Sequence, residues 1–183
     1  MKNNHFSRRT FLKKSALTTG FFAAGSVGMA GDSLNNSNTS GKLPREVWIG
    51  TFSQSGLTAG TSKQMVDRVI EMLKEMMSYR PDIICLPEVF PTSNIEKQYS
   101  LREKLALSGE VLKRFSQFAR QNACYLICPV YTSDGKNAYN SAVVIDRKGK
   151  QMGAYHKIHL TTGEIEAGLT PGPLEPPVFR SEE

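Results

Sequence analysis

The apolar run at residues 82–86 (DIICL) constrains the fold of this chain more than any other feature of its sequence. A strand that is apolar at successive positions has both faces buried, which is typical of a strand in a parallel sheet covered by helices. Pro87 ends the run, because proline has no backbone N–H to donate to a sheet. The neighbouring segments should therefore supply helices.

Amphipathic helices are expected on both sides of this strand. The first begins at Thr61 or Ser62 and runs to about Tyr79, before Pro81. Its apolar positions recur at three- and four-residue spacing, as one buried stripe requires: Met65, Val66, Val69, Ile70, Leu73 and Met76. The second is expected over residues 109–122. Its apolar positions are Val111, Leu112, Phe115, Phe118 and Ala119.

Four further segments have the composition of strands. One lies at residues 47–52, and three lie close together at residues 124–131, 139–146 and 151–155. The connections between these last three are polar and contain glycine, which is typical of hairpin turns. The order β-α-β-α-β-β-β predicts an α/β fold with a parallel core sheet flanked by helices and hairpins added at one side.

The positive charge of the chain is concentrated at its beginning. The net charge is +6 at pH 7. The first 31 residues contain no acidic side chain and five basic ones, which are Lys2, Arg8, Arg9, Lys13 and Lys14. The rest of the chain is close to neutral and has no basic face to follow a phosphate backbone, so no nucleic-acid partner is expected.

Residues 1–30 have the features of an export signal. Residues 7–13 (SRRTFLK) resemble the twin-arginine signal of bacteria, and a weakly apolar run with a small-x-small cleavage site follows. A retained membrane anchor is the alternative, but the run has only about 15 residues where a span needs roughly 20. We expect a periplasmic or secreted protein that meets the twin-arginine export machinery and has no stable membrane insertion.

A polar segment separates this signal from the body of the protein. Residues 31–43 (GDSLNNSNTSGKL) cannot bury enough apolar surface to become ordered and are expected to form a flexible linker. The predicted organisation is therefore a signal at 1–30, a linker at 31–43 and one domain at 44–183.

Three cysteines lie in apolar runs: Cys85, Cys124 and Cys128. An odd number without regular spacing does not indicate a disulfide framework, so we expect unpaired core residues. Twin-arginine export carries folded proteins, as that resemblance implies. Folding would then finish in a reducing cytoplasm, which is consistent with unpaired cysteines.

Glu88 is the first candidate for chemistry. It lies just past the end of a buried strand, where α/β sheets bind ligands. Beside Pro87, Val89 and Phe90 its carboxyl would be partly desolvated, and desolvation raises a carboxyl pKa toward the range of a general base. An ordinary solvent-facing loop glutamate is the alternative.

Lys157 is the second candidate, because it follows the strand expected at residues 151–155. An ammonium group at that place can stabilise negative charge that develops on a substrate oxygen. A solvated lysine after a turn is the alternative. His156 and His159 lack nearby cysteines or paired acids, so we expect no metal site.

Together these segments resemble the nitrilase, or carbon–nitrogen hydrolase, superfamily. The family has an apolar strand that ends in Pro-Glu, here DIICLPEVF, and a Lys-x-His-Leu segment some seventy residues later, here YHKIHL. Residues 139–142 (YNSA) and 163–172 (GEIEAGLTPG) also look like family segments. The resemblance covers roughly residues 45–175. It implies the α-β-β-α sandwich of that superfamily, of which this chain would hold the incomplete N-terminal half.

The resemblance also implies roles for named residues. A cysteine thiolate attacks an amide or nitrile carbon. Glu88 would be the general base, and Lys157 would stabilise the charged tetrahedral intermediate. A second glutamate would orient the lysine, with Glu166 as the first choice and Glu164 as the alternative. His159 would help hold the lysine loop, and no metal or organic cofactor is implied.

The nucleophile of this family follows the lysine in the sequence, but no cysteine follows Lys157 here. Cys85 lies inside the expected strand, and alternation would turn its side chain away from that of Glu88. We therefore expect an N-terminal part of a longer protein, truncated before its nucleophile. By itself it should be inactive and poorly soluble, because a sheet edge would be unpaired and an apolar helix-packing surface exposed.

The function expected of the parent protein is hydrolysis of carbon–nitrogen bonds other than peptide bonds. Its substrate would be a small amide, N-carbamoyl amine or nitrile, and a homodimer or higher oligomer is implied by resemblance. A non-catalytic exported binding protein on the same fold is the alternative, favoured if the parent lacks the cysteine. A membrane-embedded acyltransferase of the superfamily would need several transmembrane spans, which this sequence does not contain.

Overall fold

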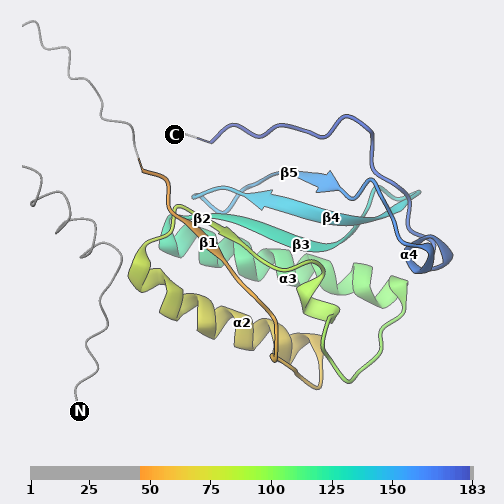
Figure 1. The fold of residues 1–183 in the computed structure, drawn as a ribbon, viewed down its shortest axis with the longest axis horizontal. Helices are drawn as coiled ribbons and strands as arrows, with labels where there is room; N and C mark the ends of the chain where they lie inside the picture. The colour runs from red at the N-terminus through yellow and green to blue at the C-terminus, as the bar shows by residue number, and fades with distance from the viewer. Residues whose placement is uncertain (1–45, 182–183) are drawn as a thin grey trace, which may run out of the picture. The chain divides into compact units, whose positions relative to one another are not determined.

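The computed structural model describes residues 46–181, so the predicted signal and linker lie outside the described residues. The element order confirms the expected β-α-β-α-β-β-β pattern, with a short helix added at the end (Figure 1). The elements are β1 (Ile49–Thr51), α2 (Ser62–Met76), η1 (Met77–Tyr79), β2 (Ile83–Cys85), η2 (Phe90–Thr92), α3 (Leu101–Asn122), β3 (Tyr125–Ser133), β4 (Ala138–Ile145), β5 (Gln151–His156) and α4 (Thr162–Glu166).

The described strands form one mixed sheet in the order β1-β2-β3-β4-β5. The first three are parallel to one another, and β4 and β5 continue the sheet as antiparallel hairpins. In the register, Ile84 lies beside Leu126, and Cys128 lies beside Val143. The parallel core with hairpins at one side is therefore confirmed.

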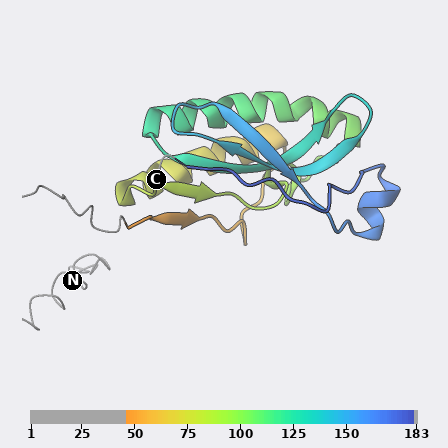
Figure 2. The ribbon, with the colours of Figure 1, turned by 90° about the horizontal axis from the view of Figure 1, so that it is seen from above.

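Helices α2 and α3 cover one face of this sheet (Figure 2). The strands contribute alternate residues to the core between the layers, because successive side chains point to opposite faces. Phe90 and Phe115 meet there edge to face, with ring centroids 5.3 Å apart. The fully buried residues of the core include Met65, Val69, Leu73, Ile84, Phe115, Leu126, Cys128 and Ile145.

The opposite face of the sheet is more open. Ile83, Ile127 and Val144 are only half-buried there, and Ile49 on the edge strand β1 is 65% exposed. The Phe179 ring packs on this face against Gly153, where a Cβ atom would lie only 2.7 Å from the ring. Among the described residues there is one helix layer and one sheet, so the sandwich expected from the family resemblance is represented by these two layers.

Helix α3 begins at Leu101, and the expected start at residue 109 is wrong. Ser100 and Glu103 form a capping box, in which the Ser100 N–H donates to Glu103 Oε2 at 2.8 Å. Gly109 was a misleading boundary, because a glycine inside a helix costs only about 1 kcal/mol relative to alanine. In residues 46–181, no helix combines the length and apolar character that a membrane crossing requires.

Candidate active site

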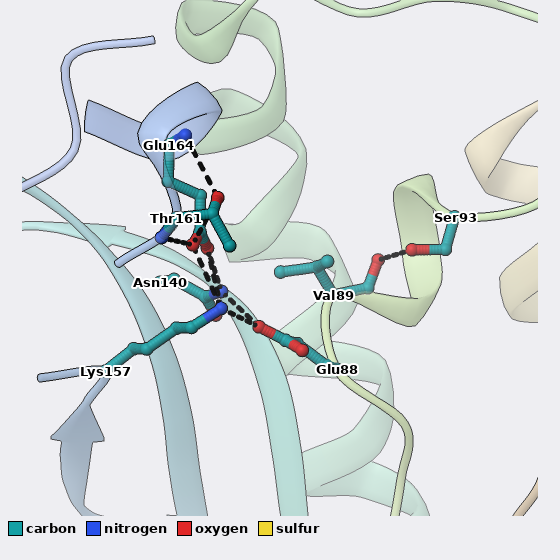
Figure 3. A network of polar contacts seen from close by, with 7 residues as sticks. All are labelled: Glu88, Val89, Ser93, Asn140, Lys157, Thr161 and Glu164. Carbon is teal, nitrogen blue, oxygen red and sulfur yellow. Dashed lines mark hydrogen bonds and ion pairs between the residues drawn. The ribbon is translucent and has the colours of Figure 1, made fainter. Parts of the chain in front are cut away.

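Four polar side chains meet at one end of the sheet (Figure 3). Glu88 follows β2, Asn140 belongs to β4, Lys157 follows β5, and Glu164 belongs to α4. Glu88 and Lys157 are thus brought together as expected, although 69 residues separate them. Strands β2 and β5 run in the same direction, so the residues that follow them lie at the same end of the sheet.

The backbone of Lys157 is held on both sides. Its N–H donates to the Asn140 carbonyl at 2.8 Å, and its own carbonyl accepts from the N–H of Gly172 at 2.9 Å. A Cβ atom on Gly172 would lie 2.8 Å from the carbonyl carbon of His156. Only glycine allows this approach of two backbone segments, so Gly172 is part of what positions the lysine.

The ammonium group of Lys157 lies between two carboxylates. Its Nζ is 2.8 Å from Glu88 Oε1, 2.9 Å from Glu164 Oε2 and 3.2 Å from Glu164 Oε1. The hydrogen bond to Glu88, followed by that to Glu164, raises the pKa of Lys157. The lysine is therefore held in its charged form, which is the form that stabilises an oxyanion.

The glutamate that contacts Lys157 is Glu164. Glu166 was the first choice for this contact and Glu164 the alternative, so the choice is corrected to Glu164. Glu164 is the third residue of α4 and closes a capping box, since its Oε2 accepts from the Thr161 N–H at 2.8 Å. Glu166 is exposed at the end of this short helix. The pattern Thr-x-x-Glu at residues 161–164 was the sequence signal that could have decided between them.

The charge of Glu164 is strongly stabilised. Burial by itself raises its pKa, but hydrogen bonds from the Thr161 backbone, the Asn140 amide and Lys157 outweigh burial and bring the pKa to about 2. The side chain is only 15% exposed. This carboxylate is therefore suited to hold a cation in place and unsuited to take up a proton near neutral pH.

Asn140 is a site residue for which no role was predicted from the sequence. Its Nδ2 donates to Glu88 Oε1 and to Glu164 Oε1, each at 2.7 Å. Each carboxylate thus receives hydrogen bonds from both Asn140 and Lys157. Asn140 therefore links the two carboxylates on either side of the ammonium, and Glu88 is the more exposed of the two.

The turn that carries Glu88 has an unusual backbone. Val89 has φ +41°, which is a rare conformation for a β-branched residue. Its carbonyl accepts from Ser93 Oγ at 3.2 Å (Figure 3). The same carbonyl accepts from the Thr92 N–H at 3.0 Å. From beneath, Gln54 Nε2 donates to the carbonyls of Phe90 and Ser93, each at 3.0 Å. These contacts hold the turn in place.

The Glu88 carboxyl was expected to be partly desolvated, and among residues 46–181 this expectation is wrong. Its side chain is 60% exposed, because Val89 turns the chain so that Phe90 enters the core while Glu88 stays at the surface. One oxygen of the carboxylate is engaged by Lys157 and Asn140. The exposed side leaves room for a reacting group.

The side chains behind the site are linked across three strands. Ser141 Oγ is 2.6 Å from Thr132 Oγ1 and 2.7 Å from His156 Nδ1, and the His156 ring stacks on Tyr139 with centroids 4.2 Å apart. His156 therefore holds the end of β5, next to Lys157. His159, which was expected to help hold the lysine loop, is exposed. Within residues 46–181 no group of three His, Cys, Asp or Glu residues could hold a metal ion.

The three cysteines are unpaired, as expected. Cys124 and Cys128 are fully buried. Burial raises the pKa of Cys124 to about 11, and it raises the pKa of Cys128 by a larger amount. Cys85 is half-buried in the middle of the sheet. A thiol that resists ionisation is a poor nucleophile, so the buried pair has a structural role.

Comparison with known proteins gives concordant results. A family model described as carbon-nitrogen hydrolase matches residues 51–183. A nitrilase from Pyrococcus abyssi (strain GE5 / Orsay) is 31% identical over 94 residues, which make up 49% of this chain and 35% of that protein.

Two solved structures show the same fold. A carbon-nitrogen hydrolase from Helicobacter pylori G27 matches with a TM-score of 0.59 and 21% identity, over 70% of this chain and 45% of the other. An amidase from Nesterenkonia sp. matches with a TM-score of 0.58 and 20% identity, over 74% of this chain and 51% of the other. The chain thus spans about a third of the nitrilase and about half of each solved protein.

Proposed function

This chain belongs to the carbon–nitrogen hydrolase family, and from that membership we propose that the whole protein hydrolyses a carbon–nitrogen bond other than a peptide bond. The substrate is a small amide, an N-carbamoyl amine or a nitrile. The observation that carries this proposal is the lysine ammonium placed 2.8 Å from Glu88 and 2.9 Å from Glu164. The two carboxylates differ in exposure, so they can serve different purposes. The exposed Glu88 can accept a proton from a reacting group, and the enclosed Glu164 can hold the ammonium in place.

Each residue of the cluster has one task in the proposed reaction. Glu88 is the general base, because its carboxylate is exposed to a reacting group and lies 2.8 Å from the lysine ammonium. Lys157 stabilises the oxyanion. Glu164 orients Lys157, since both of its oxygens lie close to the ammonium. Asn140 fixes the spacing between the two carboxylates.

The proposed nucleophile is a cysteine that follows residue 183. One structure of the Nesterenkonia amidase contains acrylamide joined by Michael addition to its active site cysteine. That protein is about twice as long as the matched part of this chain, since 54% of it is covered. Cys124 and Cys128 are poor candidates because burial raises the pKa of both thiols.

The proposed steps for an amide balance as follows. Glu88 takes the thiol proton, and the thiolate sulfur bonds to the carbonyl carbon to give an oxyanion beside Lys157. Glu88 then passes the proton to the nitrogen, the C–N bond breaks, and ammonia or an amine leaves a thioester. Water attacks the thioester carbon and gives a proton to Glu88. The C–S bond then breaks, Glu88 returns this proton to the sulfur, and the acid product leaves the regenerated thiol.

The test is ammonia release from butyramide by the full-length protein. Glu88→Gln and Lys157→Gln should each lower kcat by about 100-fold or more, in line with the contributions of a general base and an oxyanion-stabilising group. Glu166→Gln is the matched control, because this glutamate is exposed and lies outside the cluster. Hydrolysis that survives Glu88→Gln at the original rate would rule out the assigned base.

The alternative is a non-catalytic exported binding protein on the same fold. Sequencing the gene beyond codon 183 distinguishes the two proposals. A cysteine in a strand-to-helix turn supports the hydrolase, and a reading frame without one supports the binding protein.

We also propose export through the twin-arginine pathway to the periplasm or the medium. Residues 7–13 support it, and the family match begins only at residue 51. Cell fractionation should find the protein outside the cytoplasm, and replacement of Arg8 and Arg9 by lysine should retain it inside.

A further inference from the structure

A cavity adjoins the charged cluster on the side of Glu164. Its volume is about 310 Å³, and it lies between the first turns of α3, the end of β3 and α4. Its polar lining includes Lys104, Tyr131, Thr161 and Glu164. A narrower cavity on the side of Val89, next to Glu88, shares two of these residues, Lys104 and Tyr131. The two residues therefore lie where the two cavities meet, and Glu164 of the cluster lines the wider one.

Lys104 contributes the only cationic side chain that lines either cavity among the described residues. No carboxylate of residues 46–181 lies within ion-pair distance of it. Glu103, its neighbour on α3, is occupied in the capping box with Ser100. The ammonium group of Lys104 is thus available to an anionic group that enters the cavity.

The ammonium group of Lys104 lies over an aromatic ring. Lys104 Nζ lies 5.3 Å from the centroid of the Tyr131 ring, a distance at which a cation and a ring attract each other. Tyr131 is half-buried, and burial, followed by the charges of Glu164 and Glu88, raises the pKa of its hydroxyl. The phenol therefore stays protonated and can donate a hydrogen bond beside the lysine.

On the basis of the function proposed above, we propose that Lys104 selects amide substrates that carry a carboxylate at the end remote from the scissile bond. The amide would lie at the cluster, and the carboxylate would pair with Lys104 in the adjoining cavity. A neutral amide of the same length leaves the ammonium without an anionic partner, so the charged substrate is favoured.

The test uses substrate pairs that differ only at the remote end. Succinamate and butyramide have chains of equal length, and so have glutaramate and valeramide. The two pairs differ by one methylene group, so two distances between the amide and the remote carboxylate are tested. In the full-length protein, Lys104→Gln should lower the ratio of kcat/KM for the acidic over the neutral amide by about 10- to 100-fold, as for a charged hydrogen bond. Lys113→Gln, an exposed lysine on the same helix, should leave the ratio unchanged. An unchanged ratio in Lys104→Gln for both pairs would overturn the proposal.

Failure of the proposed hydrolysis can be told apart from failure of this inference. If the unsubstituted protein hydrolyses none of the four amides, succinamate and glutaramate are titrated into it by calorimetry. A dissociation constant raised about tenfold or more by Lys104→Gln, but not by Lys113→Gln, supports an anion subsite without catalysis. Equal affinities in all three proteins would reject the subsite.

Discussion

The two turns that carry the candidate site are built in opposite ways. The Glu88 turn contains a strained residue, Val89, and is held by Gln54, which lies more than thirty positions earlier in the sequence. The lysine turn is held by a capping box within residues 161–164 and by the nearby Gly172. Glu88 is 60% exposed, whereas Glu164 is 15% exposed.

This difference matches the tasks proposed for the two turns. The base must reach a reacting group, so it stands on an exposed turn whose backbone is fixed from beneath. The partner of the lysine must keep its charge and its place, so it is enclosed by local donors. A substitution in the Glu88 turn should therefore affect stability through contacts with residues distant in the sequence. A substitution in the lysine turn should affect stability through the charge of Glu164.

Gln54→Ala should break the first turn and give the largest loss of stability. It removes the one donor that the Ser93 carbonyl has among the described residues, and it leaves the Phe90 carbonyl with only the long bond from the Ser93 N–H at 3.4 Å. We expect a loss of about 2–4 kcal/mol in the free energy of unfolding, measured by urea denaturation. Gln117→Ala, an exposed glutamine on α3, is the control. Equal midpoints for the two variants would show that Gln54 does not hold the turn.

Acid should weaken the second turn. The pKa of Glu164 is lowered on folding from about 4.5 to about 2, so its contribution is complete above pH 4.5 and is lost as the pH falls toward 2. We expect a loss of about 1–3 kcal/mol over this window. Glu164→Gln should flatten the stability profile there, and Glu166→Gln should not. Parallel profiles for the two variants would contradict the assignment.

Gly172→Ala should separate the lysine from its backbone support. The added methyl group overlaps the backbone of His156, and overpacking of this kind costs about 1–3 kcal/mol. Unfolding measurements give the cost, and the NMR resonance of the Lys157 side chain reports whether the ammonium moves. Gly163→Ala is the control, since nothing lies within 4 Å of that position. An unshifted lysine resonance in Gly172→Ala would count against this role.

Val89→Gly should have the smallest effect. Glycine adopts φ +41° freely, so relief of strain offsets the lost side chain and the net change should stay below about 1 kcal/mol. Val144→Gly, at a half-buried position in β4, should cost about 2 kcal/mol by the same unfolding assay. If Val89→Gly costs as much, the turn is not strained.

The sequence predicted the sheet and helices because their signals are local. The apolar run of β2 and the helical spacing of α2 each lie within one element, and the polar glycine turns marked the hairpins. The start of α3 was missed because Gly109 was given more weight than the pattern Ser-x-x-Glu at residues 100–103.

The site was predictable only in part. Glu88 and Lys157 were found through motifs. Glu164 could have been chosen over Glu166 from its capping position. Asn140 and Gln54 act on partners far along the chain, and nothing near them in the sequence indicates those partners. The exposure of Glu88 likewise depends on the backbone angle of Val89, which a valine does not suggest.

The sequence separation of the cluster residues also bears on the order in which they come together during folding. Lys157 and Glu164 are 7 residues apart, but Glu88 is 52 residues from Asn140 and 69 from Lys157. Closing a short loop costs less entropy than closing a long one, so we expect the lysine and its orienting glutamate to pair early in folding. Glu88 joins only when strands β2 to β5 are in register. The base would then meet its lysine last, so a nascent chain would carry no assembled cluster until its sheet is complete.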